Sequence, residues 1–277
     1  MSGVGKALKK RYGDFLGDVY YDGLLEAISS EYKRAMMSLQ AVLASLFKPS
    51  KSHLKGDLNW QPVPFNYIPF AKDNLLATYI TCPDIFNLQT DLDEDTQKLY
   101  TYLSKYSGLN ITNSQELFTV YHNLRSLYEL NLEVPDWVKR IWPQPIKNAS
   151  QQFWEDIINQ QLKKSAGSLL KKIHEDSQRK IDGSFKPKIV IYSGHDINIV
   201  SLMGAFKLFQ KENIRYGSYV IVELHKIEND YYIKIIYENY NLSKPEVMHV
   251  PGCSEFCKFE KFVEVTKMFY PNENWCS

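Results

Sequence analysis

His195 and Asp196 are the two residues whose chemistry stands out in this sequence of 277 residues. They follow an apolar, β-branched run at 188–192 that predicts a buried parallel strand, and they precede residues 197–208, which predict a helix. Ligands of open α/β sheets bind beyond the carboxyl ends of the strands, often where the next helix begins. An imidazole there can donate a hydrogen bond to an anion, and a carboxyl can give up a proton. A purely structural turn is the alternative interpretation.

Other site chemistries lack the residues that they need. The sequence has no Gly-x-Ser-x-Gly, and Gly3-Val-Gly-Lys6 imitates a phosphate loop but has Ala7 where serine or threonine ligates magnesium. Cys253-x3-Cys257 has no second close pair of cysteines or histidines, and no two histidines have metal-ligand spacing. We therefore expect neither a metal nor another cofactor.

The first part of the chain predicts helices around one extended segment. Residues 6–13 predict the end of a short basic helix, and residues 35–47 predict a buried helix that stops before Pro49. Residues 60–70 contain too many prolines for a central strand, so they predict an edge strand or an extended crossover.

The middle third is predicted to be helical. Residues 91–106 and the long amphipathic stretch 151–180 predict two helices, and Asn113-x-x-Glu116 resembles a capping box that opens a third, which ends at about residue 130. Gly167 indicates a break in the long helix or a close helix contact. His174 lies on the polar stretch of that helix and is expected to be solvated.

The last third returns to strands. Residues 219–225 and 231–237 predict two strands joined by a hairpin at 228–230. Helices and parallel-type strands in this order predict an α/β fold. We place its core at residues 1–71 and 166–277, with a mostly helical insertion at 72–165.

Composition excludes several classes of protein. Hydrophobic residues make up 44% of the chain, and 33 lysines and arginines against 32 acidic residues leave a net charge of +1, which offers no field to attract nucleic acid. No apolar run approaches the ~20 residues of a membrane span. The start of the chain has no apolar stretch typical of a signal peptide.

Two features nevertheless point to the secretory pathway. Asn110, Asn148 and Asn241 begin N-glycosylation acceptor patterns in stretches that are typical of surface loops. The even number of cysteines permits three disulfide pairings, with free cytosolic thiols as the alternative. The cysteines are Cys82, Cys253, Cys257 and Cys276.

Tyr192-Ser-Gly-His-Asp196 resembles the C-terminal catalytic signature of the histidine acid phosphatases, the family of the prostatic, lysosomal and insect venom acid phosphatases. The insect venom members are the most similar. Further stretches agree in order along nearly the whole chain: Arg11-Tyr-Gly-Asp-Phe-Leu-Gly17, Ser29-Ser-Glu-Tyr-Lys-Arg34, Met37-Ser-Leu-Gln40, Asn59-Trp-Gln-Pro-Val-Pro64, Asp73-Asn-Leu-Leu76, Val222-Glu-Leu-His225 and Pro251-Gly-Cys-x3-Cys257.

The resemblance implies a three-layer histidine-phosphatase fold, like that of the phosphoglycerate mutases, with a helical insertion. It implies hydrolysis of phosphate monoesters at acidic pH through a phosphohistidine, without metal or cofactor. His195 would contact the phosphoryl group and Asp196 would protonate the leaving alcohol. The implied partner is a phosphate monoester or phosphate, the compartment is secreted or lysosomal, and the family allows a homodimer.

The chain departs from the family pattern in two places. It contains no Arg-His-Gly, the motif that carries the nucleophilic histidine and the first arginine, so the first catalytic strand is expected to be missing. Ile28 stands where the family has a phosphate-binding arginine. We therefore expect an N-terminally truncated or degenerate member that is weakly active or inactive. The alternative is a non-catalytic secreted or venom-type protein that uses the phosphatase scaffold for binding.

The resemblance also implies structural details. Cys253 is expected to pair with Cys257, and Cys82 with Cys276, which would tie the C-terminal tail to the start of the helical insertion. The missing strand is central in the family, so its neighbours are expected to expose unpaired backbone groups and apolar faces.

Overall fold

Three parallel strands form the first of two sheets. The computed structural model describes residues 1–49, 59–90, 92–240, 245–272 and 275–276. Strand β1 (Leu25–Ser30) lies between β2 (Asn66–Ile68) and β3 (Ile189–Ser193), and all three run in the same direction. β2 is an edge strand, which confirms the prediction from its prolines. β1 was not predicted, because its polar residues conceal the pattern of a strand.

A hairpin builds the second sheet. β4 (Tyr219–Ile227) and β5 (Asp230–Glu238) pair in antiparallel register, and both β6 (Glu246–Met248) and β7 (Cys257–Lys258) pair with β5. The predicted hairpin is confirmed, and its turn places Glu228 in the left-handed region with a φ of 56°.

Two helices cover one face of both sheets. α1 (Ser2–Leu16) and α2 (Lys33–Leu46) approach so closely that a Cβ on Gly5 would lie 2.3 Å from the carbonyl oxygen of Val42. Their buried side chains pack against residues of three strands, which fixes the position of this helical layer. Those residues are Leu25 and Ala27 of β1, Ile189 and Ile191 of β3, and Tyr219 and Ile221 of β4.

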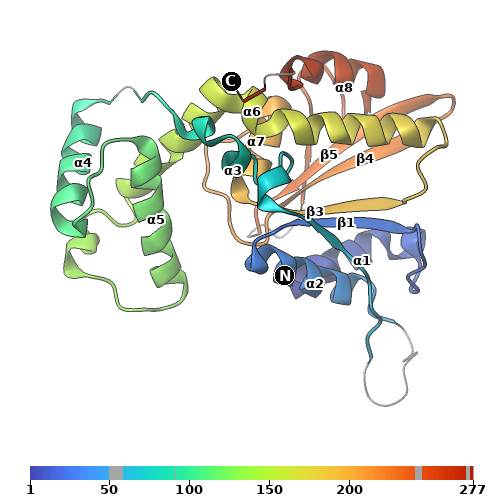
Figure 1. Ribbon diagram of the computed structural model, residues 1–277, viewed down its shortest axis with the longest axis horizontal. Coiled ribbons are helices and arrows are strands. Elements are labelled where there is room, and N and C mark those ends of the chain that lie inside the picture. The colour runs from blue at the N-terminus through green and yellow to red at the C-terminus, as the bar shows by residue number, and fades with distance from the viewer. Residues whose placement is uncertain (50–58, 91, 241–244, 273–274, 277) are drawn as a thin grey trace.

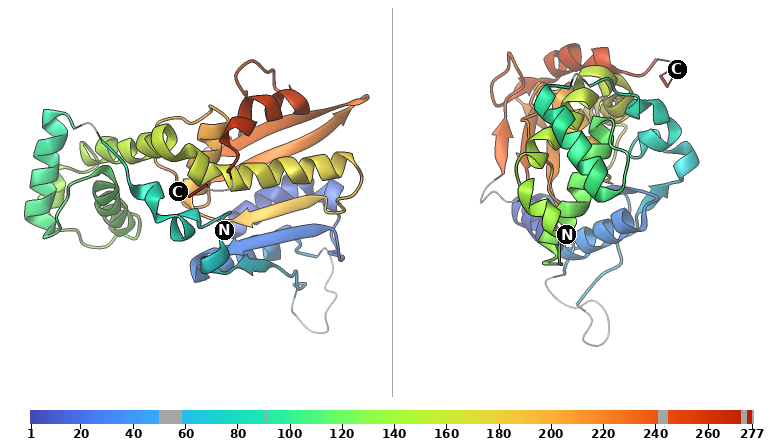
Figure 2. Two further views of the ribbon diagram at one scale, coloured as in Figure 1. Left: turned by 45° about the horizontal axis from the view of Figure 1, so that its top comes forward. Right: turned by 90° about the vertical axis from the view of Figure 1, so that its left-hand side faces the viewer.

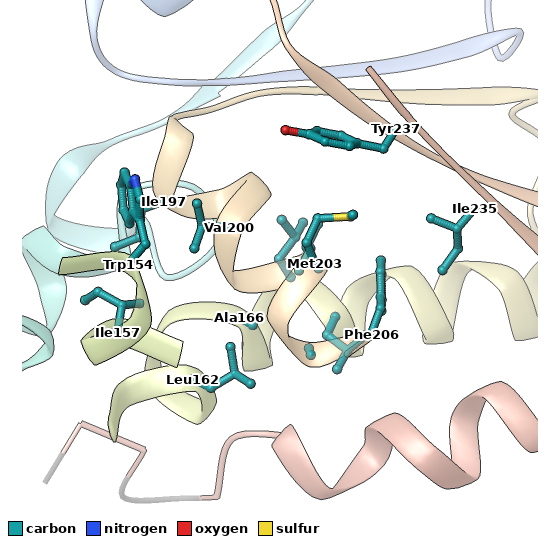
Figure 3. Close-up of a cluster of buried hydrophobic side chains, with 14 of the residues drawn as sticks. Trp154, Ile157, Leu162, Ala166, Ile197, Val200, Met203, Phe206, Ile235 and Tyr237 are labelled. Carbon is teal, nitrogen blue, oxygen red and sulfur yellow. The ribbon is translucent and has the colours of Figure 1, made fainter. Parts of the chain in front are cut away.

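Three helices cover the opposite face: α6 (Ile146–Ile181), α7 (Asp196–Ala205) and α8 (Phe259–Thr266). Figure 3 shows Val200 and Met203 of α7 between α6 and the residues of β5, with Phe206 just beyond the helix. Ile28, Tyr192, Val220 and Val222 pack against the same cluster. Both sheets therefore share one middle layer, and the three-layer α/β fold is confirmed.

The edges of β3 and β4 that face each other are open. Within the described residues β3 pairs only with β1, and β4 pairs only with β5. A cavity of about 1340 Å³ is lined by every residue from Lys188 to His195 and by every residue from Gly217 to His225. The expected unpaired edges are therefore present in the structure.

The middle of the chain forms a helical projection. α4 (Glu94–Ser107), α5 (Ser114–Glu129) and the start of α6 lie away from both sheets (Figure 1), and the turned views agree (Figure 2). Asn113 caps α5 by accepting from the amide of Glu116 at 3.0 Å, as the capping box predicts. The remaining short helices are α3 (Thr78–Thr81) and 3-10 turns at Phe70–Lys72, Pro83–Phe86, Asp136–Arg140 and Lys267–Phe269.

α6 departs from its prediction in where it begins and in the surroundings of His174. It begins five residues earlier, at Ile146, and passes Gly167 without a break. A Cβ on Gly167 would lie 2.3 Å from the carbonyl oxygen of Phe269, so this glycine marks a close contact. His174 is only 3% exposed and hydrogen-bonds to Tyr270 and Thr266, so the expectation of a solvated side chain is wrong.

The structure contains both disulfides that the resemblance implied. Cys82 pairs with Cys276 and Cys253 with Cys257, with Cα atoms 5.4 Å and 5.0 Å apart. Asn110 is exposed in a loop, whereas Asn148 is exposed in the first turn of α6 and not in the predicted loop. Asn241 lies outside the described residues. In the described part of the chain, no helix is both long enough and apolar enough to cross a bilayer.

Candidate functional site

The turn between β3 and α7 positions His195 and Asp196. A Cβ on Gly194 would lie 2.3 Å from Oδ1 of Asn198, so the turn requires glycine. The amide of His195 donates to that same oxygen at 2.7 Å, and the amide of Asn198 donates back to the carbonyl of His195 at 3.0 Å. These reciprocal bonds hold the turn at the carboxyl end of β3, as predicted.

His195 lies against hydroxyl and aromatic groups from two other segments. Its Nε2 atom is 2.9 Å from Oγ of Ser30, at the carboxyl end of β1. The rings of Tyr32 and Tyr79 meet the imidazole edge-on, with centroids 4.9 and 5.8 Å away. Burial, reinforced by the charge of Arg34, lowers the pKa of His195 to about 4. At pH 5 the unliganded imidazole is therefore neutral and offers one N–H donor.

Asp196 is the first residue of α7. Its Oδ1 atom accepts from the amide of Ile197 at 3.0 Å. Like His195, it lines both the large cavity and a smaller one of about 180 Å³. The structure thus brings the two predicted site residues to one place, where their side chains reach open space.

Arg34 is a site residue that sequence reasoning did not identify. It is exposed in the first turn of α2, with its guanidinium carbon 4.1 Å from the centre of the Tyr32 ring. It lines both cavities together with His195 and Asp196. A guanidinium can match phosphate oxygens with paired donors. The only signal for Arg34 in the sequence was its place at the end of residues 29–34, a stretch that resembles the family.

Ile28, which the resemblance matches with an arginine of the family, lies on β1. Alternation along a strand puts its side chain on the same face as Ser30, the residue that contacts His195. Ile28 is partly buried against the cluster formed with α6 and α7. An isoleucine has no donor for a phosphate oxygen, so this position contributes apolar contact only.

The helical projection closes the other side of the site. The smaller cavity is lined by Tyr79, Phe86, Phe118, Phe153 and Trp154 together with Asp196. We call these five aromatic residues the aromatic wall. The sequence did not predict it, because its residues lie far apart in the chain.

His122 of α5 lines the large cavity with Asp196 and packs against Phe118, with centroids 4.2 Å apart. Burial lowers the pKa of His122, and the charge of Asp196 opposes that shift. Arg125 joins α5 to the segment before β4 through a 3.0 Å bond to the carbonyl of Ile214.

The arrangement combines an anion-binding pair with a proton source. His195 and Arg34 can donate to the oxygens of a phosphoryl group, and Asp196 can protonate a departing oxygen. Among the described residues, no group of three or more His, Cys, Asp or Glu side chains is arranged to hold a metal ion.

Comparison with known families and proteins agrees with this geometry. The family model described as "Histidine phosphatase superfamily (branch 2)" matches residues 1–132 and 122–238. Venom acid phosphatase Acph-1 of Apis mellifera is 32% identical, over 97% of this chain and 73% of that protein. Human prostatic acid phosphatase is 27% identical, over 98% and 74%, and rat lysosomal acid phosphatase is 26% identical, over 98% and 68%.

Solved structures share the fold at low sequence identity. A Klebsiella phytase has a TM-score of 0.68 at 15% identity, over 97% of this chain and 84% of that one. A phytase from D. castellii has a TM-score of 0.54 at 13% identity, over 97% of this chain and 62% of that one. These structures, together with the family match, confirm the expected fold and the resemblance.

Proposed function

The chain belongs to branch 2 of the histidine phosphatase superfamily, and we propose that residues 1–277 bind the phosphoryl group of phosphate monoesters and hydrolyse such esters weakly or not at all. The observation that carries the binding proposal is the meeting of His195, Asp196 and Arg34 at the carboxyl edge of the first sheet. The acid phosphatases among the relatives make a phosphate ester the expected ligand.

Each of the three side chains has a distinct role in this proposal. Arg34 and His195 hold two non-bridging oxygens of the phosphoryl group. In the weak hydrolysis that remains, a water oxygen bonds to phosphorus as the bond from phosphorus to the ester oxygen breaks, and Asp196 gives its proton to that departing oxygen while the attacking water loses one to solvent. The half-buried position of His195 strengthens its hydrogen bond, because the surrounding aromatic rings exclude water. The aromatic wall of the smaller cavity is placed to receive the organic part of the ester.

Weak turnover is supported by two features of residues 1–277. They contain no Arg-His-Gly, so the family's nucleophile is not among them. Ile28 replaces a charge-stabilising donor, and losing one such donor typically costs about 10²–10³ in turnover. Losing a nucleophile that acts as a unit with its partners costs on the order of 10⁶.

The alternative is a non-catalytic secreted or venom-type binding protein that keeps the scaffold. Ile28 favours it, because an apolar residue has replaced a catalytic one within the packed layer. Two disulfides and the exposed Asn110 and Asn148 support a secreted or lysosomal protein that is glycosylated. Within either function we propose residues 72–165 as a cap on a core of residues 1–71 and 166–277.

Phosphate binding and turnover at pH 5 test the proposal together. We expect no detectable hydrolysis of p-nitrophenyl phosphate, and inorganic phosphate binding that weakens about tenfold or more in Arg34→Ala and His195→Ala, as loss of a charged hydrogen bond implies. Arg140→Ala is the matched control, since Arg140 is exposed and lines neither cavity. Ile28→Arg should tighten phosphate binding without restoring turnover.

Two outcomes contradict the proposal. Turnover in the ordinary range of enzymes, about 1–10³ s⁻¹, that disappears in His195→Ala would show that the surviving residues suffice for full catalysis. Phosphate binding that is unchanged in both Arg34→Ala and His195→Ala would place the anion elsewhere.

A further inference from the structure

The smaller cavity, of about 180 Å³, is formed almost entirely by the middle of the chain. Its lining comes from α3, α5, α6, α7 and the 3-10 turn at Pro83–Phe86, and Arg34 is the one lining residue that lies outside residues 79–197. The volume lies below the ~300–1,000 Å³ of ordinary small-molecule pockets, so the cavity takes only a compact group.

The five rings of the aromatic wall contact one another in a continuous series. Consecutive ring centroids are 4.6–6.0 Å apart, and consecutive ring planes are inclined to each other by 32–74°. Because no two consecutive rings are parallel, the wall suits a compact, rounded group better than a flat ring that stacks on one face. The series runs Tyr79, Phe86, Phe153, Phe118 and Trp154.

The charges around the smaller cavity favour a cation. The faces of aromatic rings carry negative potential, and the carboxyl group of Asp196 belongs to the same lining. His195 is neutral above pH 5, because burial lowers its pKa to about 4. Arg34 is the one basic residue in the lining, and it also faces the large cavity, where an anion can pair with it.

We propose that the smaller cavity binds a methylated ammonium group, with the aromatic wall around its methyl groups and Asp196 as its counter-charge. A quaternary ammonium ion has no N–H donor, so it leaves no hydrogen bond unmade when aromatic rings replace water, and the ring faces attract its charge. A primary ammonium ion is strongly hydrated and would lose that hydration to a wall with few acceptors.

The cation subsite adjoins the residues that we assign to phosphoryl binding. Arg34, His195 and Asp196 line both cavities, so a cation in the smaller one lies next to them. The subsite would therefore favour esters whose alcohol part carries a methylated ammonium group. That consequence rests on the proposed function, whereas binding of the cation alone does not.

Three small alcohols test the subsite in calorimetric titrations of residues 1–277 at pH 7. Choline carries the quaternary ammonium group, 3,3-dimethylbutan-1-ol has the same shape without the charge, and ethanolamine has the charge with three N–H donors. We expect choline to bind about tenfold or more tightly than either of the others. Inorganic phosphate, titrated separately, tests the proposed function. A preference for choline without any phosphate binding would support the subsite and contradict the proposed function.

Two variants locate the bound cation. Phe118→Leu keeps an apolar side chain but removes a ring, and Asp196→Asn keeps the shape but removes the charge. Each should weaken choline binding about threefold or more and leave 3,3-dimethylbutan-1-ol unaffected, which also shows that the cavity is intact. Tyr106→Leu is the matched control, since Tyr106 is an exposed aromatic residue of α4 that lines neither cavity.

Four results would overturn the proposal. The first is the absence of saturable choline binding. Equal affinity for choline and 3,3-dimethylbutan-1-ol would show that the wall is merely apolar. Ethanolamine binding as tight as choline binding would assign the attraction to the charge of Asp196 without the rings. A choline preference unchanged in both Phe118→Leu and Asp196→Asn would place the cation elsewhere.

Discussion

The helical projection and the sheet layer are packed in opposite ways. In the projection, Leu103, Leu117, Val138 and Ile146 have no exposed surface. Tyr121 and Tyr128 stack on Trp142 around the same cluster. In the sheet layer, all five residues of β3 remain partly exposed, although most of them are apolar.

The difference follows from where each region finds its partners. The cluster of the projection draws on residues 92–149 alone, and its helices satisfy their backbone groups internally. The strands collect partners from Leu25 to Lys258, and each open edge depends on a neighbour that no helix can replace. We therefore expect local opening to begin at the unpaired edges of β3 and β4 rather than in the helices.

Removing the disulfide between Cys82 and Cys276 should have the largest effect, because it joins the base of the projection to the C-terminal tail. It closes a loop of 194 residues, for which chain entropy predicts a loss of about 5 kcal/mol in the free energy of unfolding. The double variant Cys82→Ala/Cys276→Ala tests this by urea denaturation. Cys253→Ala/Cys257→Ala, with a separation of four residues, is the control and should lose about 2 kcal/mol. Equal losses would contradict the expectation.

A pair of truncations compares the two regions directly. Leu117→Ala removes a side chain with no exposed surface, so a loss of about 2–5 kcal/mol in unfolding free energy is expected. Ile191→Ala removes a side chain that already borders the large cavity between β3 and β4, and we expect a loss of less than about 1.5 kcal/mol because little new cavity is created. Urea midpoints of both variants measure the difference. A loss of stability in Ile191→Ala as large as that in Leu117→Ala would contradict the presence of open space beside Ile191.

Acid should lower the free energy of unfolding through His174, a buried residue of α6. Burial lowers the pKa of His174 to about 4, whereas an unfolded histidine titrates near 6.5. Between these values the unfolded state binds the proton and the folded state does not, so stability falls as the pH drops from about 6.5 to 4, by about 3 kcal/mol for this residue. Unfolding free energies at pH 7, 5.5 and 4.5 measure the slope. His174→Gln should flatten it, and an unchanged slope would assign the acid sensitivity to other groups.

The smallest effect is expected at the start of α5. Asn113→Ala removes the side chain that accepts from the amide of Glu116, and loss of such a cap costs about 1 kcal/mol. Asn123→Ala, at an exposed interior position of the same helix, is the matched control. A loss at Asn113 no greater than at Asn123 would mean that packing of the projection alone defines where α5 begins.

The sequence pattern predicted those elements that are determined by residues close to one another in the chain. The β-branched run of β3, the glycine turn before His195 and the cap at Asn113 were all predicted, because each depends on neighbours within a few residues. β1 has polar residues at Glu26, Ser29 and Ser30 and becomes a strand through pairing with β2 and β3. Its strand character comes from partners that lie far away in sequence.

The same reason explains what was missed at the candidate site and at His174. Lys171, Lys172 and Glu175 make the surroundings of His174 polar in sequence, but Phe262 of α8 and Tyr270 cover its ring in the structure. Arg34 and His122 come from different helices and reach the cavity only through tertiary packing. The resemblance supplied the roles of His195 and Asp196 and the disulfide pairs, which the local pattern alone left open.

α6 gives the molecule a mechanical property. At ~1.5 Å per residue its 36 residues span about 54 Å without a kink at Gly167. The start of α6 belongs to the projection, and its second half packs against the sheet layer. Between the two, the close contact of Gly167 with Phe269 holds the helix in place. For a straight, rigid helix, any tilt about this contact would move Ile146 about 1.5 times as far as Ile181, because Ile146 lies farther from Gly167 along the helix. Phe153 and Trp154 of α6 line the smaller cavity, so the width of that cavity depends on the angle of this one helix.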